Sequence, residues 1–382
     1  MWENYYTFMA EKNTTADYIR SQEMFKQFLK QKGGKIPFDV FMQESLYGRP
    51  QSFYEHVTIG HNADFLTFAS LPLFGELIGR HIKNAIDQDD IEPFCLELAG
   101  GMGVFKESLI RTMSDHGVDL DYVSIDHSAH LLTKQSQFGG RNIRGSALDL
   151  PLADRSIRGT VFMNELFDNL PFKVTRLRKN RYEMPVVEEL FYGFEKPGRV
   201  GAVWETTTDE RLLRYWDRQF AYMKRHFGFN PAWDLDSSVI STVNLNEERL
   251  VNELARVVDH GQVIIADYGY VLQKGIFAQE QTLAVRMFPS RKTSKLEDIH
   301  HKVYDADITA HVNFTDVMLL AEAAGFTIRR FDAQQHYVWD VVTPSENTLL
   351  KKQQELHPWH PQKKVLAEGG THSGMYVLVL TK

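Results

Sequence analysis

Residues 94–126 read FCLELAGGMGVFKESLIRTMSDHGVDLDYVSID, which is an apolar segment, a glycine-rich loop, a helical segment and a second apolar segment ending on an acid. This order predicts a strand, a loop, a helix and a strand. In such a unit, small residues let the backbone approach an adenosine-containing ligand, and the terminal acid accepts hydrogen bonds from a ribose. We therefore expect Asp126 to bind the ribose. The loop residues expected to contact the cofactor are Ala99, Gly100, Gly101 and Gly103.

The alternation of apolar and helical segments continues beyond this stretch. Alternation of this kind predicts a parallel sheet with right-handed crossovers. We therefore expect an α/β fold, a Rossmann-like sheet with helices on both faces. The expected strands are 94–98, 122–125, 143–145, 160–163, 263–266 and 375–380, and the expected helices are 104–116, 129–138, 247–258 and 315–324.

Two regions interrupt the alternation. The apolar spacing of residues 16–33, 36–47 and 64–80 predicts a helical N-terminal cap over residues 1–90. Residues 172–244 are predicted to be an insertion over the substrate, with strands at 182–192 and 199–206 and a helix at 212–227. The core would then comprise residues 91–171 and 245–382, with a loop at 271–304 whose polar, basic part, 288–301, is predicted to be mobile.

Composition narrows the class of protein. The chain has 382 residues, 43% of them hydrophobic, and a formal net charge of −7, which argues against binding to nucleic acid by phosphate neutralisation. The basic run KVTRLRKNR, residues 173–181, is interpreted as a solvated face. Cys95 is the only cysteine, and no apolar stretch of about 18 residues occurs. We expect a cytoplasmic protein without a disulfide, a membrane span or a metal site.

Polar residues follow several expected strands, at the edge of the sheet where ligands bind in such folds. Glu97 could orient the glycine loop, reach the cofactor through water or cap the following helix. After residues 160–163 comes NELFDNLP, residues 164–171. Its Glu165 and Asp168 are candidates for orienting a methyl acceptor. The alternative is that the segment is a polar loop in which Asp168 only caps a helix. The cofactor is either a dinucleotide or S-adenosylmethionine, because no lysine followed by Ser or Thr closes the loop.

Six pieces of the chain together resemble the MidA family of class I S-adenosylmethionine-dependent methyltransferases, which includes a protein arginine methyltransferase. The matching pieces run the length of the chain. All six stand in the family's order. They are IPFDVFMQESLY (36–47), ADFLT with FGELIG (63–67 and 74–79), LELAGGMG (96–103), NELFDNLP (164–171), ADYGY (266–270) and DADITAHVNF (305–314).

The resemblance implies S-adenosylmethionine as cofactor and adds site residues. Residues 145–154, GSALDLPLAD, are similar to the adenine-binding loop of many methyltransferases. His311 is implied as a general base, or as a structural histidine braced by Asp307. Further residues implied in cofactor binding are His127, Ser146, Ala147, Leu148 and Asn164, and others that would line or brace the pocket are Asp64, Thr67, Asp267 and Thr309.

The chain also departs from the family pattern. Where the family's loop reads ELGPGRG, this chain has Ala99, Gly100 and Met102 at the Gly, Pro and Arg positions. Asp126 stands where the family has Glu, a conservative change for a ribose acceptor. Residues 68–70, FAS, replace a Pro-Glu pair. These differences indicate a methyltransferase with a retained cofactor site and a changed acceptor side.

The expected function is methyl transfer from S-adenosylmethionine to a nitrogen or oxygen atom of an acceptor, either a protein arginine or a small molecule. The alternatives are a small-molecule O- or N-methyltransferase of a biosynthetic pathway, a non-catalytic assembly factor that retains the fold, and an NAD-dependent oxidoreductase. Besides the acceptor, a second copy in a homodimer is the expected partner, with no nucleic acid and no membrane.

Overall fold

The computed structural model describes residues 15–59, 67–89, 91–182, 184–230, 238–273, 285–288, 296–334, 336–337 and 374–382. The chain forms two compact units, each built from segments that are distant in sequence. The first unit comprises residues 1–57, 170–245 and 272–311, and the second comprises 58–169, 246–271 and 312–382. Residues 58–90, which the sequence analysis assigned to the N-terminal cap, thus group with the second unit.

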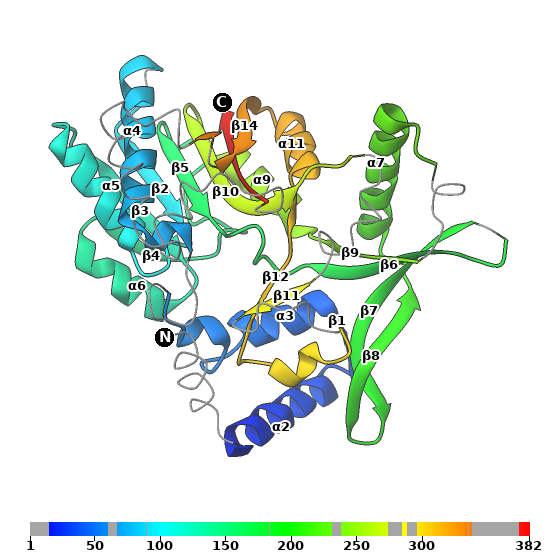
Figure 1. The fold of residues 1–382 in the computed structure, drawn as a ribbon. Coiled ribbons are helices and arrows are strands. Elements are labelled where there is room, and N and C mark those ends of the chain that lie inside the picture. The colour runs from blue at the N-terminus through cyan, green and yellow to red at the C-terminus, as the bar shows by residue number, and fades with distance from the viewer. Residues whose placement is uncertain are drawn as a thin grey trace, which may run out of the picture. The chain divides into compact units, whose positions relative to one another are not determined.

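The second unit contains a mixed sheet with the strand order β14-β15-β10-β5-β2-β3-β4 (Figure 1). The five strands from β10 to β4 run parallel, whereas β15 is antiparallel to both β10 and β14. The short β13 pairs with the end of β10. Their bounds are β2 Phe94–Leu98, β3 Asp121–Asp126, β4 Arg141–Arg144, β5 Thr160–Asn164, β10 Gln262–Tyr270, β13 Val312–Asn313, β14 Thr327–Ala333 and β15 Met375–Thr381.

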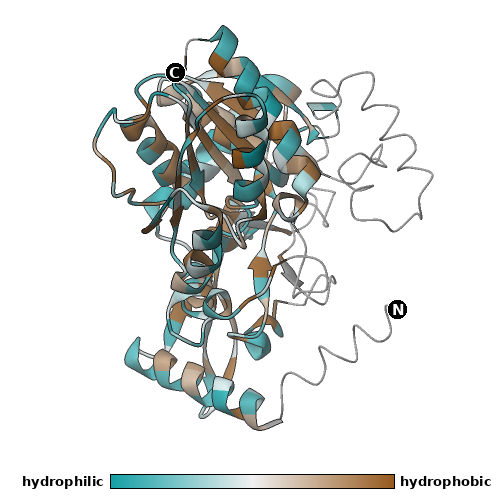
Figure 2. Cartoon of the chain, turned by 90° about the vertical axis from the view of Figure 1, so that its left-hand side faces the viewer, coloured by the Kyte–Doolittle hydropathy of each residue, from teal (hydrophilic) through white to brown (hydrophobic). Residues whose placement is uncertain are grey.

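Helices cover this sheet on both faces, as the alternating sequence predicts (Figure 1). On one face α4 and α5 pack together and bury phenylalanine rings against the strands; the rings of Phe105 and Phe162 stack with centroids 3.9 Å apart. On the other face α9 packs against α11. Figure 2 shows the strands as mainly hydrophobic, whereas the helices also carry hydrophilic residues. The bounds are α4 Pro72–Gln88, α5 Val104–Asp115, α6 Ala129–Gln135, α9 Asn246–Val257 and α11 Phe314–Ala323, with short 3-10 helices η2 Phe68–Ser70 and η3 Ser136–Phe138.

The strand order reverses between β2 and β5. From β2 the chain moves outward through β3 to β4, and it then returns to place β5 on the opposite side of β2. Ligands of open α/β sheets bind outside the carboxyl ends of the strands at such a reversal. The two segments that leave this edge are residues 99–103 after β2 and residues 165–168 after β5.

The first unit is organised around a second, antiparallel sheet with the order β1-β7-β6-β9, in which β8 also pairs with β7. Helix α3 packs on β6 and β7, and its Phe38 and Phe41 contact the rings of Phe172 and Tyr192. The bounds are α2 Thr15–Gln31, β1 Lys35–Pro37, α3 Phe38–Tyr47, η1 Phe53–Glu55, β6 Lys173–Lys179, β7 Pro185–Lys196, β8 Arg199–Thr206, α7 Glu210–Phe227, β9 Val239–Val243, β11 Arg286–Phe288, η5 Ile299–Lys302 and β12 Asp307–Thr309.

The structure corrects two sequence-based interpretations. Most of the basic run 173–181, interpreted as a solvated face, forms strand β6, which ends at Lys179, and Lys173 is buried with its Nζ 2.5 Å from Glu189 Oε1. Two further cations of this strand, Arg176 and Arg178, pair with Glu188 of the neighbouring strand, so opposite charges on paired strands allow a basic segment to enter a sheet. The stretch 288–301, predicted to be a mobile loop, includes the start of η5.

Several expected element boundaries also differ. The strand expected at 182–192 is β7, which begins at Pro185, and the helix expected at 129–138 ends as α6 at Gln135 before a 3-10 turn. The helix expected at 64–80 is α4, which begins at Pro72. Of the ADFLT piece only Thr67 belongs to the described residues, so Asp64 lies outside them.

Candidate cofactor and acceptor site

The loop after β2 has the backbone conformation that its small residues allow. Gly101 and Gly103 have φ angles of 53° and 82°, and Ala99 adopts a φ of 57°. This left-handed region favours glycine, and a side chain there is strained. A Cβ atom at Gly103 would also lie 2.8 Å from the Phe138 ring. The glycines are therefore needed both for the turn and for close packing.

Glu97 lies beneath this loop as a buried carboxylate. Its Oε2 accepts a hydrogen bond of 2.6 Å from the Tyr122 hydroxyl, and a Cβ atom at Gly100 would lie 2.4 Å from the same oxygen. Burial raises the pKa of Glu97 to about 7, against the opposing effects of Tyr122 and Lys106. Of the roles considered from the sequence, this geometry favours support of the loop backbone.

A buried lysine lies near this carboxylate. Lys106 of α5 donates a 2.9 Å hydrogen bond to Asn142 Oδ1, and its Nζ lies 5.4 Å from the centroid of the Tyr122 ring. Burial lowers the pKa of Lys106, while the negative charge of Glu97 opposes that shift. The charge of Glu97 is thus partly balanced below the loop.

Gln135 joins the loop to the expected ribose acid. Its Nε2 donates to the Gly101 carbonyl oxygen at 3.0 Å and to Asp126 Oδ2 at 3.1 Å. The other oxygen of Asp126, Oδ1, accepts from the Ser128 backbone N–H at 3.0 Å. The sequence analysis missed Gln135, because nothing in the pattern of α6 marks which polar residue turns back toward the strand ends.

The segment after β4 forms a tight turn. Ser146 Oγ accepts from the Leu148 N–H at 3.1 Å, and the Ser146 carbonyl oxygen accepts from the Asp149 N–H, also at 3.1 Å. Ala147, between them, is half-buried like both of its neighbours. His127 is exposed, and its carbonyl oxygen accepts from Arg144 Nε at 3.2 Å. The Ser146 hydroxyl therefore stabilises the turn that presents this segment.

The segment after β5 also begins with a strained residue. Glu165 has a φ of 49°, and its Oε1 accepts from the Phe68 backbone N–H at 3.1 Å and from Asn164 Nδ2 at 3.0 Å. Strained backbone at a functional edge persists only where the surroundings hold it. Asn164 is buried, and its Oδ1 has no hydrogen-bond partner among the described residues. Asn164 thus has an acceptor atom for which the described structure supplies no donor.

Asp267 of β10 holds the same segment through its backbone. Its Oδ2 accepts from the N–H groups of Phe167 (2.9 Å) and Asp168 (3.3 Å), and its Oδ1 accepts from its neighbour Tyr268 at 2.7 Å. Asp267 is fully buried, which raises its pKa well above the ordinary value, and the charge of Glu165 acts in the same direction. A buried carboxylate therefore fixes the path of NELFDNLP.

The predicted site residues divide between the two units. All the predicted cofactor residues, together with Glu165 and Asp168, belong to the second unit. Glu97 lies within β2, Asp126 and Asn164 are the last residues of β3 and β5, and the others follow strands β2 to β5. His311 ends the first unit, between β12 and β13. Within the described ranges, no three or more His, Cys, Asp or Glu side chains are placed to hold a metal ion. In the same ranges, no helix has the length and apolar composition of a membrane span.

Residues 77–331 match the family described as "Putative S-adenosyl-L-methionine-dependent methyltransferase". The chain belongs to this family. The match extends from α4 to β14 and so includes every strand-end segment described above. S-adenosylmethionine is therefore the cofactor.

Solved structures share the fold. A protein from Burkholderia thailandensis, crystallised with bound S-adenosyl-homocysteine, aligns with a TM-score of 0.74 at 17% identity, covering 96% of this chain and 93% of that chain. A native crystal structure of an uncharacterised protein from the same organism aligns with a TM-score of 0.72 at 18% identity, covering 96% and 92% of the two chains. Among curated proteins, no sequence matches this chain.

The residues present suit this cofactor. Among the described residues, a Cβ atom at Gly101 would meet only Ile59 Cδ1, at 3.4 Å, so these residues leave room for a ligand beside the loop. Asn164 Oδ1, which accepts no hydrogen bond from the residues that the structure describes, offers an acceptor for a donor such as an ammonium group. Asp126 is held in place by two hydrogen bonds, and a carboxylate can accept further bonds from hydroxyl groups.

Proposed function

We propose that this protein transfers a methyl group from S-adenosylmethionine to a nitrogen or oxygen atom, and that the acceptor is a protein arginine, as in the MidA family. The observation that carries the proposal is the pair of acids that follows β5, Glu165 and Asp168, beside the glycine loop at the reversal of strand order. Two carboxylates suit a cationic acceptor with several N–H donors.

The cofactor would be held by the segments after β2, β3, β4 and β5. We assign the ribose to Asp126, the loop backbone to Gly101 and Gly103, the adenine to residues 146–148 and the ammonium group to Asn164. When bound, S-adenosylmethionine supplies a methyl group that is already activated by its positive sulfur. The chain therefore needs mainly to align an acceptor with it and to accept a proton.

Glu165 and Asp168 would have different tasks in that alignment. Glu165 already accepts two hydrogen bonds on Oε1, so it would brace η2 against the end of β5 while contributing negative charge. Asp168 has its backbone fixed by Asp267 and its side chain 8% exposed, and we assign it the direct contact with the acceptor. His311 is proposed as the base that accepts the proton.

The test is transfer of a tritiated methyl group to nonapeptides with a fixed central arginine and random flanks, with mass spectrometry to locate the methyl group. We expect label on the guanidinium and a loss of about 100-fold in kcat/KM for Asp168→Asn with unchanged cofactor affinity. Asp115→Asn, an exposed position on α5, is the matched control and should behave as the wild type.

Each outcome separates one part of the proposal. Label on carbon or sulfur would contradict a nitrogen or oxygen acceptor, and label on a small amine but not on peptides would contradict the arginine. Wild-type transfer by Asp168→Asn would remove the role given to this carboxylate. Cofactor binding without transfer to any peptide or amine would favour a non-catalytic assembly factor.

A further inference from the structure

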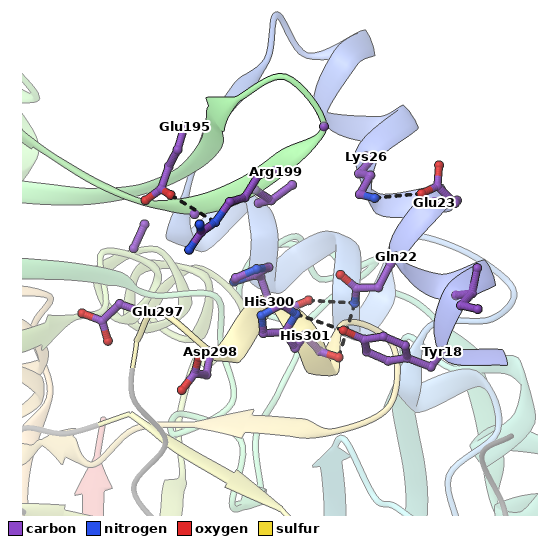
Figure 3. A pocket seen from close by; sticks show the side chains of 15 residues that line it. Tyr18, Gln22, Glu23, Lys26, Glu195, Arg199, Glu297, Asp298, His300 and His301 are labelled. Atoms are coloured by element: carbon purple, nitrogen blue, oxygen red, sulfur yellow. Dashed lines mark hydrogen bonds and ion pairs between the residues drawn. The ribbon is translucent and has the colours of Figure 1, made fainter. Parts of the chain in front are cut away.

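The first unit contains a cavity of about 480 Å³ that has no part in the proposed methyl transfer. It lies between helix α2, the turn that joins β7 to β8, and the segment that leads into η5 (Figure 3). All of its lining residues belong to this one unit. A volume of this size is in the range of ligand-binding sites.

The charges of the lining do not balance. Glu23 pairs with Lys26 at 2.8 Å, and Glu195 pairs with Arg199 at 3.7 Å. The carboxylates of Glu297 and Asp298 also line the cavity, and within the described ranges neither of them has an ion-pair partner. Counted over the described lining residues, the cavity therefore carries an excess of two negative charges, which favours a cationic ligand.

His300 does not supply the missing positive charge. The side chain is 3% exposed, and its burial, together with the neighbouring His301, lowers the pKa to about 4, so the ring is neutral near pH 7. Its Nδ1 has no hydrogen-bond partner in the part of the chain that the structure describes. This wall thus keeps a buried polar atom unsatisfied beside two uncompensated acids.

The wall itself is held in place from α2. Gln22 Nε2 donates to the carbonyl oxygens of His300 (3.2 Å) and His301 (3.3 Å), and the Tyr18 hydroxyl is hydrogen-bonded to His301 Nδ1 at 3.1 Å (Figure 3). On the same helix, Tyr18 and Ile19 are 40% and 56% exposed, which is high for large apolar side chains. The cavity therefore offers a preformed acidic wall beside an apolar surface.

The opposite wall includes the start of β8, a strand that lies at the edge of its sheet. Strand β8 pairs with β7 on one side, and for the described residues no backbone hydrogen bond joins its other side to another segment. Gly198, in the turn before this strand, and residues 199–202, at its start, line the cavity. A free edge of this kind can bind an extended peptide through backbone hydrogen bonds.

We propose that this cavity binds an extended, basic segment of a protein partner, with lysine or arginine side chains held by Glu297 and Asp298 and its backbone paired to β8. The cavity has three features that a ligand must match, which are the two acids, the apolar surface of Tyr18 and Ile19, and the edge strand β8. A basic polypeptide matches all three, because it has cationic side chains, apolar side chains and backbone hydrogen-bonding groups. A small amine would satisfy only the charge. The inference does not depend on the proposed methyl transfer, because binding is measured without cofactor.

The test uses the full chain and a fluorescein-labelled peptide of alternating valine and arginine, followed by fluorescence anisotropy. We expect saturable binding that weakens with salt, and a loss of about tenfold in affinity for the double variant Glu297→Gln, Asp298→Asn. The matched control, Asp115→Asn with Glu322→Gln, removes two exposed acids on α5 and α11 and should bind as the wild type. Circular dichroism checks that each variant is folded.

Modified probes test the two recognition elements separately. A peptide with glutamate in place of arginine should not bind, and one with alternate backbone nitrogens methylated should bind at least tenfold more weakly because it cannot pair along β8. Equal binding to the double variant, or no saturable binding of the basic peptide, would overturn the proposal. Arginine amide binding as tightly as the peptide would overturn the assignment to a polypeptide.

Discussion

The loops after β2 and β5 leave neighbouring strands, and both begin with a non-glycine residue in the left-handed region, Ala99 and Glu165. They are held there in different ways. The first loop is supported by packing, because the Glu97 side chain fills the space under Gly100. The second is held through its backbone, because Asp267 accepts hydrogen bonds from the N–H groups of Phe167 and Asp168.

This difference matches the two tasks proposed for the loops. A loop that must let a cofactor approach its backbone needs small residues above and support from below. A loop that must present carboxylates needs its backbone fixed, so that the side chains keep one direction. Both supports are buried acids whose pKa values are raised, so both loops should respond to the charge beneath them.

The largest effect is expected for Asp267→Ala, which leaves three backbone N–H groups without their acceptor. Burying unsatisfied N–H groups is costly, and we expect a loss of about 4 kcal/mol in the free energy of unfolding, measured in urea. Asp259→Ala removes an acid that pairs with arginines at the surface, and it should lower the free energy of unfolding much less. Similar losses for the two variants would contradict the role given to Asp267.

The next effect is expected for Gly100→Ala. The added Cβ would lie 2.4 Å from Glu97 Oε2, so the loop or the carboxylate must move. We expect this movement to lower the free energy of unfolding by about 2–3 kcal/mol and to weaken binding of S-adenosylmethionine at least tenfold. Gly117 has a φ of 73°, and a Cβ added there would have no described atom beyond its chain neighbours within 4 Å, so Gly117→Ala tests backbone strain alone. Its cofactor affinity should be unchanged; a matching fall would show that the contact with Glu97 is not the cause.

The third effect concerns pH. The pKa of Glu97 is about 7 in the folded protein, against an ordinary value of 4.5 for the unfolded chain. Between these two pH values the folded state keeps the proton that the unfolded state has lost, so the folded state loses stability as pH rises. From pH 5.5 to 7.5 we expect this group to lower the free energy of unfolding by about 2 kcal/mol. The difference between wild type and Glu97→Gln should show this slope. A pH-independent difference would mean that Glu97 is ionised throughout.

The smallest effect is expected for Ala99→Gly. Because Ala99 has a φ of 57°, glycine should relieve strain and stabilise the fold by up to about 1 kcal/mol, with cofactor binding retained. Replacing the exposed Ala129, in the first turn of α6, by glycine should instead destabilise it. A loss of stability in Ala99→Gly would show that the methyl group makes a contact worth more than the strain.

The sequence predicted the positions along the chain of strands β2, β3, β5, β10 and β15 and the loop between β2 and α5, because periodicity and glycine are local signals. It did not predict that KVTRLRKNR enters a sheet, since that depends on Glu188 and Glu189 across the strand pair. Gln135 was missed for a similar reason. Its bonds to Gly101 and Asp126 join residues far apart in the chain, and no local pattern records them. Asp267 drew notice only through the family resemblance.

We predict that the edge of the sheet at which the β2 and β5 loops begin binds S-adenosylmethionine through Asp126. Calorimetric titration of the purified chain with S-adenosylmethionine, S-adenosylhomocysteine and NAD tests it most directly. We predict one equivalent of either adenosyl compound bound, no heat from NAD, and at least tenfold weaker binding by Asp126→Ala, which loses the ribose acceptor. Binding of NAD alone, or unchanged affinity in the variant, would contradict the claim.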